Sequence, residues 1–248
     1  MKHVEIKCGR RTFERDMPTS WNEMTCELMS VAAKLWMGSV TKEKFLALFL
    51  DVPDKVVDAM GPYLRFCLLQ LTEWIEKLEP MDRFVMDQLA DTQLLLPSAR
   101  LGACSLEQFM MADTHFQRFA IDASAVDSLD VFIAALCHSS SETLDMEQKV
   151  EIVSELDPVL KTSVFINFIM IRKWLSRSYP FLFPPPAEEE EETKADAKKH
   201  KPRPTDWLAI FDAFMGDDVA FIDRYKQMAA LDAFRLMNRR IKASKERS

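Results

Sequence analysis

Glycine is scarce in this chain. Only 5 of its 248 residues are glycine, about 2% where roughly 7% is usual. Tight hairpins, bulges and phosphate-binding loops need glycine because they require positive φ or close backbone approach. The shortage therefore argues against an α/β nucleotide-binding fold and against an all-β fold. What the chain has instead is 15 methionines and 17 phenylalanines, which point to helical faces packed with adaptable side chains.

Sequence motifs of common enzymes are also missing. The chain has no GxxxxGK[ST], GxGxxG, HExxH or GxSxG segment, and its four histidines are far apart. His115 could act as a general base near Asp113, but no candidate nucleophile accompanies it at a recognisable spacing. We favour a partly buried, structural histidine, and we expect no enzyme activity, no catalytic residue and no cofactor.

Metal-binding patterns are absent as well. The five cysteines include no CxxC pair, which excludes a zinc ribbon or a thioredoxin-like motif. We expect reduced, buried thiols, which suit a reducing cytoplasm. The carboxylates of Asp51, Asp54 and Asp58, and of Asp217 and Asp218, fall at expected helix boundaries, where acids serve as caps. We therefore predict no metal site.

The chain has neither a net positive charge nor a long apolar run. The formal charge is −7, and the acidity lies in residues 1–182, which disfavours binding to nucleic acid. The basic end of the chain, with Arg239 and Arg240, is more typical of a frayed helix terminus than of a DNA contact. The longest apolar stretch, 164–171, would span about 12 Å as a helix, far short of a bilayer core of ~30 Å. Residues 1–15 are charged throughout, so we expect neither a signal peptide nor a membrane span.

Periodicity and caps predict a mainly α fold with a short N-terminal β-hairpin over 3–16, where Val4 and Ile6 alternate with charged residues. Capping-box spacing occurs at Ser20 with Glu23 and at Ser105 with Gln108. Apolar spacing and caps predict helices over about 25–37, 41–49, 62–79, 105–119, 126–138, 145–154, 157–178 and 206–215, and one from 219 onward. Residues 80–104 show no regular pattern.

Composition divides the chain into a helical domain over 1–182, a charged Pro-rich linker over 183–205, and a C-terminal helical module over 206–248. The module is too small to bury its own apolar surface. It must dock on the main body, on a second copy or on a partner. The candidate partner-binding residues are its aromatic side chains, Trp207, Phe211, Phe214, Phe221, Tyr225 and Phe234.

Several segments together resemble a known group of proteins. Residues 18–25 (Pro-Thr-Ser-Trp-Asn-Glu-Met-Thr) resemble a Pro-x-x-Trp-x-Glu-Leu-Thr opening, with Met24 in place of leucine. Further resembling segments are 105–113 with Phe116 and Phe119, Ala134 to Leu136 (followed by Cys137 where an aromatic is common), Arg172 to Tyr179-Pro180 with Phe183, and Trp207 with the last helix. This combination is similar to helical proteins encoded in phage and prophage tail gene clusters, including tail assembly chaperones. The resemblance implies a protein that holds a tape-measure protein before the tail polymerises.

We therefore expect a non-enzymatic assembly protein that captures apolar helical segments of a protein partner in methionine- and phenylalanine-lined grooves. The first alternative is a structural virion or tail component that assembles by strand addition and helix packing. An enzyme with an unrecognised cleft and a DNA-binding regulator follow it. The sequence leaves open a homo-oligomer, and also whether the C-terminal module docks in cis or in trans.

Overall fold

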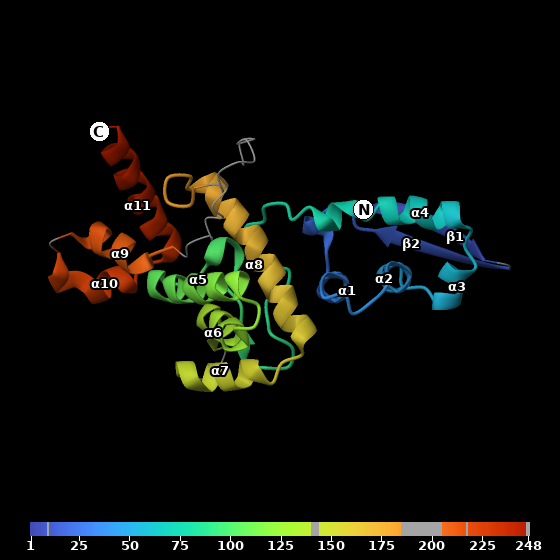
Figure 1. Cartoon of the computed structure of the whole chain (residues 1–248), viewed down its shortest axis with the longest axis horizontal. Coiled ribbons are helices and arrows are strands. Elements are labelled where there is room, and N and C mark those ends of the chain that lie inside the picture. Colours follow the sequence, from blue (N-terminus) through green and yellow to red (C-terminus); the bar gives the residue numbers. More distant parts are fainter. Residues whose placement is uncertain (9, 140–143, 185–204, 217, 247–248) are drawn as a thin grey trace, which may run out of the picture. The chain divides into compact units, whose positions relative to one another are not determined.

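The computed structural model describes residues 1–8, 10–139, 144–184, 205–216 and 218–246 (Figure 1). Helices dominate these residues, and one N-terminal hairpin is present, so the expected mainly α fold is confirmed. The chain forms two compact units. The first comprises Met1–Met81 with Asp157–Met170, and the second comprises Asp82–Leu156 with Ile171–Ser248.

This division differs from the one expected from composition. The helices after residue 205 belong to the same unit as the helix that begins at Leu106. Residues 185–204, nearly all of the expected linker over 183–205, lie outside the described residues. No helix in the described ranges is both long enough and apolar enough to cross a membrane.

The hairpin opens the first unit. Strands β1 (Lys2–Cys8) and β2 (Arg11–Met17) pair antiparallel, with Ile6 opposite Phe13. Ile6 and Met17 are buried. Arg15 donates hydrogen bonds to the carbonyls of Leu50 (3.0 Å) and Asp51 (2.9 Å). These contacts tie the hairpin to the helical part of the unit, which an isolated hairpin needs for stability.

The remaining elements of the first unit are helical. They are 3-10 helix η1 (Trp21–Glu23), α1 (Cys26–Trp36), α2 (Lys42–Phe49), α3 (Asp54–Asp58), α4 (Pro62–Gln70), 3-10 helix η2 (Glu73–Glu76) and the first part of α8 (Pro158–Ser178). Thr25 and Thr41 cap α1 and α2 as expected, each accepting a backbone N–H of the first turn. The prediction of a single helix over 62–79 was wrong. The chain leaves α4 after Gln70, where the hydroxyl of Thr72 donates a hydrogen bond to the carbonyl of Leu69 at 2.8 Å.

One further expectation for this unit was wrong. Ser20 forms no capping box, because Glu23 instead accepts from the N-terminal amine of Met1 at 2.5 Å and from the backbone N–H of Thr19 at 2.7 Å. The buried face of α1 consists of Met29, Ala32 and Ala33, while Trp36 is 46% exposed.

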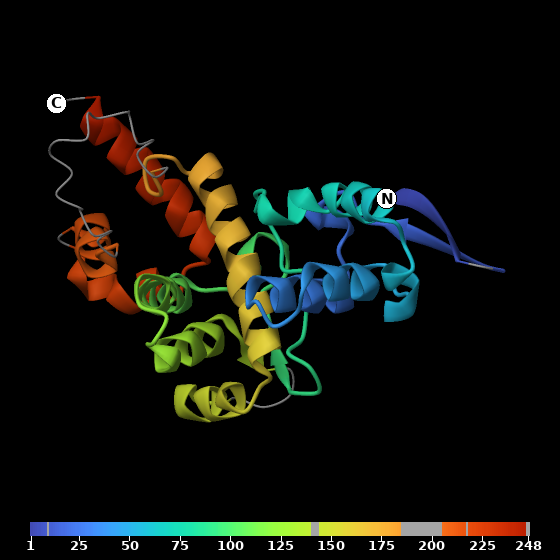
Figure 2. The same cartoon turned by 45° about the vertical axis from the view of Figure 1, so that its right-hand side comes forward.

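Helices α5 (Leu106–Ile121), α6 (Val126–Leu136) and α7 (Met146–Ser154) pack in succession in the second unit, as Figures 1 and 2 show. Capping boxes start α5 at Ser105 with Gln108 and α7 at Asp145 with Gln148. Two short strands that the sequence did not predict, β3 (Leu94–Leu95) and β4 (His138–Ser139), pair antiparallel.

The segment before α5 is irregular, as its sequence pattern indicated. It contains the 3-10 turn η3 (Ala99–Leu101) and positive φ angles at Arg100 (58°), Leu101 (53°) and Ala103 (61°). A Cβ at Gly102 would lie 2.2 Å from Oγ of Ser98, so a larger residue at this position would force the Ser98 side chain to move.

Helix α9 (Trp207–Met215), 3-10 helix η4 (Val219–Phe221), α10 (Ile222–Lys226) and α11 (Ala230–Lys245) complete the second unit. The prediction of a single helix from 219 onward was wrong. The backbone at Ala229 leaves the helical conformation and pairs with Ser105 at the start of α5. Leu106 donates its N–H to the carbonyl of Met228 at 2.8 Å, and Ala230 donates to the carbonyl of Cys104 at 3.0 Å. These long-range bonds replace helical ones, which local periodicity cannot reveal.

Candidate functional site

Phe109 of α5 is the centre of an aromatic cluster in the second unit. Its ring meets those of Phe183, Trp207 and Phe234 edge to face, at centroid distances of 5.9, 5.5 and 4.7 Å. All four side chains are buried. Each such pair adds about 0.5–1.5 kcal/mol beyond the burial of its area. The C-terminal helices are thus joined to α5 through an apolar core.

Asp113 lies one turn after Phe109 and carries a fully buried carboxylate. Its Oδ2 accepts hydrogen bonds from the indole Nε1 of Trp207, at 2.8 Å, and from the amide of Gln117. Arg172 of α8 brings its Nε to 3.2 Å from Oδ1. This approach is an ion pair without hydrogen-bond geometry, since within the described residues Oδ1 accepts no hydrogen bond.

Burial raises the pKa of Asp113 above its ordinary value, while Arg172 and the hydrogen bonds from Trp207 and Gln117 oppose that rise. Gln117 extends this polar group, because its Oε1 accepts the backbone N–H of Thr205 at 2.6 Å. The beginning of α9 is therefore held by two polar contacts to α5.

His115 does not join this group. Residues two positions apart on a helix do not face each other, and the Asp113 carboxylate is turned to Arg172, Trp207 and Gln117. In the described part of the chain Nδ1 of His115 is buried without a hydrogen-bond partner. Burial, assisted by Arg118, lowers the pKa of His115. The structure thus does not bring together the acid–base pair considered from the sequence.

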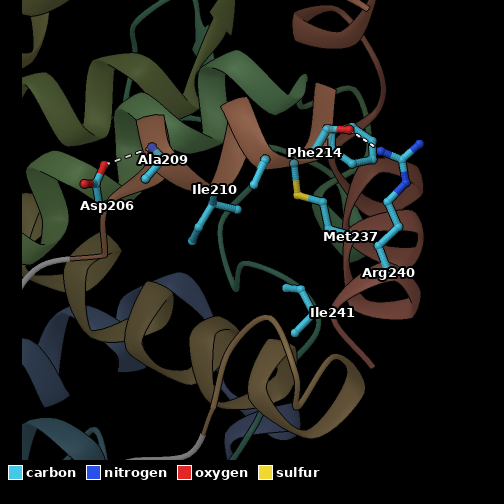
Figure 3. Close-up of a pocket in the computed structure, with 8 residues that line it drawn as sticks. Asp206, Ala209, Ile210, Phe214, Met237, Arg240 and Ile241 are labelled. Carbon is cyan, nitrogen blue, oxygen red and sulfur yellow. Dashed lines mark hydrogen bonds between the residues drawn. The ribbon is translucent and has the colours of Figure 1, made fainter. Parts of the chain in front are cut away.

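A groove with a cavity volume of about 420 Å³ runs between α9 and α11 (Figure 3). Figure 3 shows Ile210 of α9 and Met237 and Ile241 of α11 projecting into the same space. The lining side chains follow helical spacing on both walls and are mostly apolar; they are Asp206, Ala209, Ile210, Ala213 and Phe214 on one side, and Met237, Arg240 and Ile241 on the other. The groove therefore presents two facing helical ridges.

Two charged residues of the groove are already engaged with the protein. Asp206 caps α9 by accepting the N–H of Ala209 at 3.0 Å. Arg240 donates to the carbonyl of Phe214, and its guanidinium carbon lies 4.9 Å from the centroid of the Phe214 ring. Dashed lines in Figure 3 mark the hydrogen bonds of Asp206 to Ala209 and of Arg240 to Phe214. The floor between them is available for apolar contact.

The six aromatic residues predicted to bind a partner differ in their exposure in the structure. Trp207, Phe211, Phe214 and Phe234 are buried within the unit, so in this conformation they pack in cis. Phe221 is 52% exposed. Tyr225 is half-buried, packs edge to face on Phe214 at 5.3 Å and donates its hydroxyl to Asp218 at 3.1 Å.

Phe214 alone among these six lines the groove, so sequence reasoning missed most of it. The missed wall residues include Ala209, Ala213, Met237 and Ile241. Their signal was the spacing of three and four residues along each helix. That signal was outweighed by the larger aromatic side chains, whose stripe faces the core.

A smaller cavity of about 220 Å³ lies in the first unit. Its lining combines apolar side chains with several polar and charged ones; it comprises Leu35, Lys42, Phe45, Phe66, Leu69, Gln70, Thr72, Glu73 and Glu76. The groove between α9 and α11 is larger and more uniformly apolar, which makes it the stronger candidate for holding a protein segment.

No group of three or more His, Cys, Asp or Glu side chains suited to a metal ion occurs among the described residues. Asp54 pairs with Lys44 at 2.6 Å, and Asp51 pairs with Arg15 at 3.4 Å. The expectation that the thiols are buried was wrong for Cys26, which is exposed. Comparisons of the chain with protein-family models, curated proteins and solved structures found no match.

Proposed function

We propose that this chain is a non-enzymatic assembly protein that holds an apolar helical segment of a partner in the groove between α9 and α11. The observation that carries the proposal is the pair of facing ridges, each with a helical repeat, around a cavity of about 420 Å³. A third helix can lay its own ridge between two such ridges, and helix-in-groove binding is a common mode of peptide recognition.

Charge near the groove favours an acidic partner helix. The last turns of α11 carry the exposed cations Arg239, Lys242 and Lys245 next to the lining residue Arg240. Of these, Nζ of Lys242 lies 3.8 Å from Oε1 of Glu246, and Nζ of Lys245 lies 5.8 Å from the centroid of the Phe181 ring. Charges at the rim of an interface steer the encounter and fix orientation more than they add affinity. The best occupant is therefore a helix with an apolar face flanked by glutamate or aspartate.

The resemblance to phage tail assembly chaperones leads us to propose what the partner is and where the chain acts. Three of the resembling segments supply rings to the aromatic cluster, namely Phe109, Phe183 and Trp207. This convergence supports one functional unit behind the scattered motifs. In this form the partner is a tape-measure or other tail protein, the chain acts in the cytoplasm of a bacterial host, and it leaves before the tail is complete.

The test is co-expression of the chain with a candidate tape-measure protein, followed by a pull-down that measures how much of that protein is retained. Ala213→Glu places a bulky charge on the groove wall at an exposed position, and Ala243→Glu makes the same exchange on α11 outside the groove. We expect Ala213→Glu to abolish retention and Ala243→Glu to leave it unchanged. Equal retention by both variants would contradict the groove as the binding site.

A structural virion component remains a second candidate because of the hairpin. In the described residues β1 and β2 pair only with each other, so each strand has an outer edge. A strand from a neighbouring subunit could extend this sheet. Finding the protein in purified particles would favour this candidate over a chaperone.

A further inference from the structure

The two walls of the groove are fixed to the rest of the second unit by separate anchors. On α11, Asn238 uses Oδ1 to accept the backbone N–H groups of Phe181 (2.9 Å) and Leu182 (3.1 Å). On α9, the anchor is the Trp207 indole, which donates to Asp113 at 2.8 Å. Arg240 of α11 also donates to the carbonyl of Phe214 of α9, so the separation of the walls depends on these two anchors together with one direct contact between the helices.

The α9 anchor depends strongly on one carboxylate. With nine residues, α9 is shorter than helices that are stable in isolation, roughly 12–15 residues, so its placement comes from tertiary contacts. Asp113 is held in place from two sides, by Gln117 of its own helix and by Arg172 of α8. The carboxylate thus offers the indole a fixed acceptor in a fully buried position.

Trp207 and the groove residues belong to adjacent stripes of the same short helix. Ala209, Ile210 and Ala213 face the groove, while Trp207 and Phe211 face the core. A rotation or shift that frees the indole from Asp113 must also move the groove wall, because a helix this short moves as one body. The hydrogen bond between Trp207 and Asp113 therefore helps to fix the position of the groove wall.

We propose that Asp113, acting through Trp207, is the positioning residue that sets the width of the groove. This inference rests on the proposed function and names the class of partner helix. With α9 held, the side chains of Ile210, Met237 and Ile241 project into one space and limit its width, which selects a helix with aliphatic contact residues over one with bulky aromatic residues. Without the anchor, the groove loses this selectivity.

The experiment uses two synthetic amphipathic peptides, each about five helical turns long, with glutamate on the polar face. One carries leucine at every apolar position and the other carries tryptophan. Their affinities are measured by calorimetry for the full chain, for Trp207→Phe, Asp113→Leu and Asp113→Asn, and for the control Trp36→Phe, which changes an exposed tryptophan of the first unit. Ala213→Glu is included to mark binding in the groove.

We expect the wild-type chain and Trp36→Phe to prefer the leucine peptide by about tenfold. Trp207→Phe and Asp113→Leu should bring the ratio close to one. Asp113→Asn should keep the preference, because its amide oxygen still accepts from the indole. If Asp113 only supported folding, the folded Asp113→Leu and Trp207→Phe variants would keep the preference as well. Trp207→Phe keeps the ring in the core and serves if Asp113→Leu does not fold.

Two results would overturn the inference in distinguishable ways. If the leucine peptide binds and Ala213→Glu abolishes binding, but Trp207→Phe keeps the tenfold preference, the positioning role is wrong and the groove function stands. If the wild-type chain binds neither peptide, or binds both equally with Ala213→Glu unchanged, the proposed function fails and the positioning role with it.

Discussion

The indole of Trp207 donates a hydrogen bond to Asp113 at 2.8 Å, across 94 positions of the sequence. Both side chains are buried. The contact links the C-terminal helices to α5, and it involves α9, the helix that forms one wall of the apolar groove. It connects the stability of the second unit with the surface that we propose binds a partner helix.

Replacing the indole should destabilise the second unit. Trp207→Phe keeps an aromatic ring but leaves a buried carboxylate with one donor fewer, and hydrogen bonds to charged groups contribute about 1.5–3 kcal/mol. We expect a loss of this order in the free energy of unfolding, measured by urea denaturation. Trp36→Phe, at an exposed site, should change it by less than about 0.5 kcal/mol. Equal effects of the two variants would contradict the role of the Trp207 hydrogen bond.

Asp113 should make stability depend on pH in an unusual direction for a carboxylate. Burial raises its native pKa above the ordinary value of 3.8, so the folded protein binds the proton more tightly than the unfolded chain does. The resulting stabilisation is complete below the unfolded pKa and is lost as pH rises through the native one.

The measurement is the difference in unfolding free energy between the wild-type chain and Asp113→Asn as a function of pH. We expect the wild-type advantage to decrease as pH rises from about 4. An advantage that increases with pH would mean that Arg172 and the hydrogen-bond donors outweigh burial, contrary to this account.

The two phenylalanines Phe109 and Phe66 should differ sharply in their contribution to stability. Phe109 is completely buried at the centre of the aromatic cluster, whereas Phe66 is 59% exposed on α4. Truncation of a buried phenylalanine to alanine costs about 3–5 kcal/mol. We expect such a loss for Phe109→Ala, and less than about 1 kcal/mol for Phe66→Ala. Comparable midpoint shifts in chemical denaturation would argue against the cluster as a core.

Thiol labelling should distinguish the cysteines of the folded chain. Burial raises the pKa of Cys104 and of Cys137 to about 12, so both stay protonated and inaccessible, while Cys26 is exposed. We expect an aromatic disulfide reagent to modify Cys26 rapidly and the two buried thiols only on unfolding. Mass spectrometry of digested protein identifies the sites, and Cys26→Ser supplies the control. Rapid native labelling of Cys104 would contradict the packing at the start of α5.

Much of the secondary structure could be predicted because its signals are local. Thr25, Thr41, Ser105, Asp145 and Asp206 each cap the helix that follows them. A side-chain oxygen that accepts a backbone N–H two or three residues later needs no distant partner. The helix over 157–178 was likewise evident from its start at Asp157 and Pro158 and its continuous apolar pattern.

The features that escaped prediction depend on residues far apart in the sequence. The break before α11 comes from the backbone pairing of Ala229 with Ser105. The failed capping box at Ser20 reflects the competition of the Met1 amine for Glu23. The groove was not predicted because the large aromatic side chains of α9 and α11 give a stronger sequence signal than the smaller groove residues, and most of them face the core. Which of two adjacent stripes stays open is decided by packing on α5.

The most direct test of the central claim is a calorimetric titration of the full chain with an amphipathic helix that has a leucine face and glutamate flanks. The wild-type chain and Ala243→Glu should bind it with the same affinity, and Ala213→Glu should show no measurable binding. Indistinguishable isotherms for Ala213→Glu and Ala243→Glu would contradict a helix-binding groove between α9 and α11.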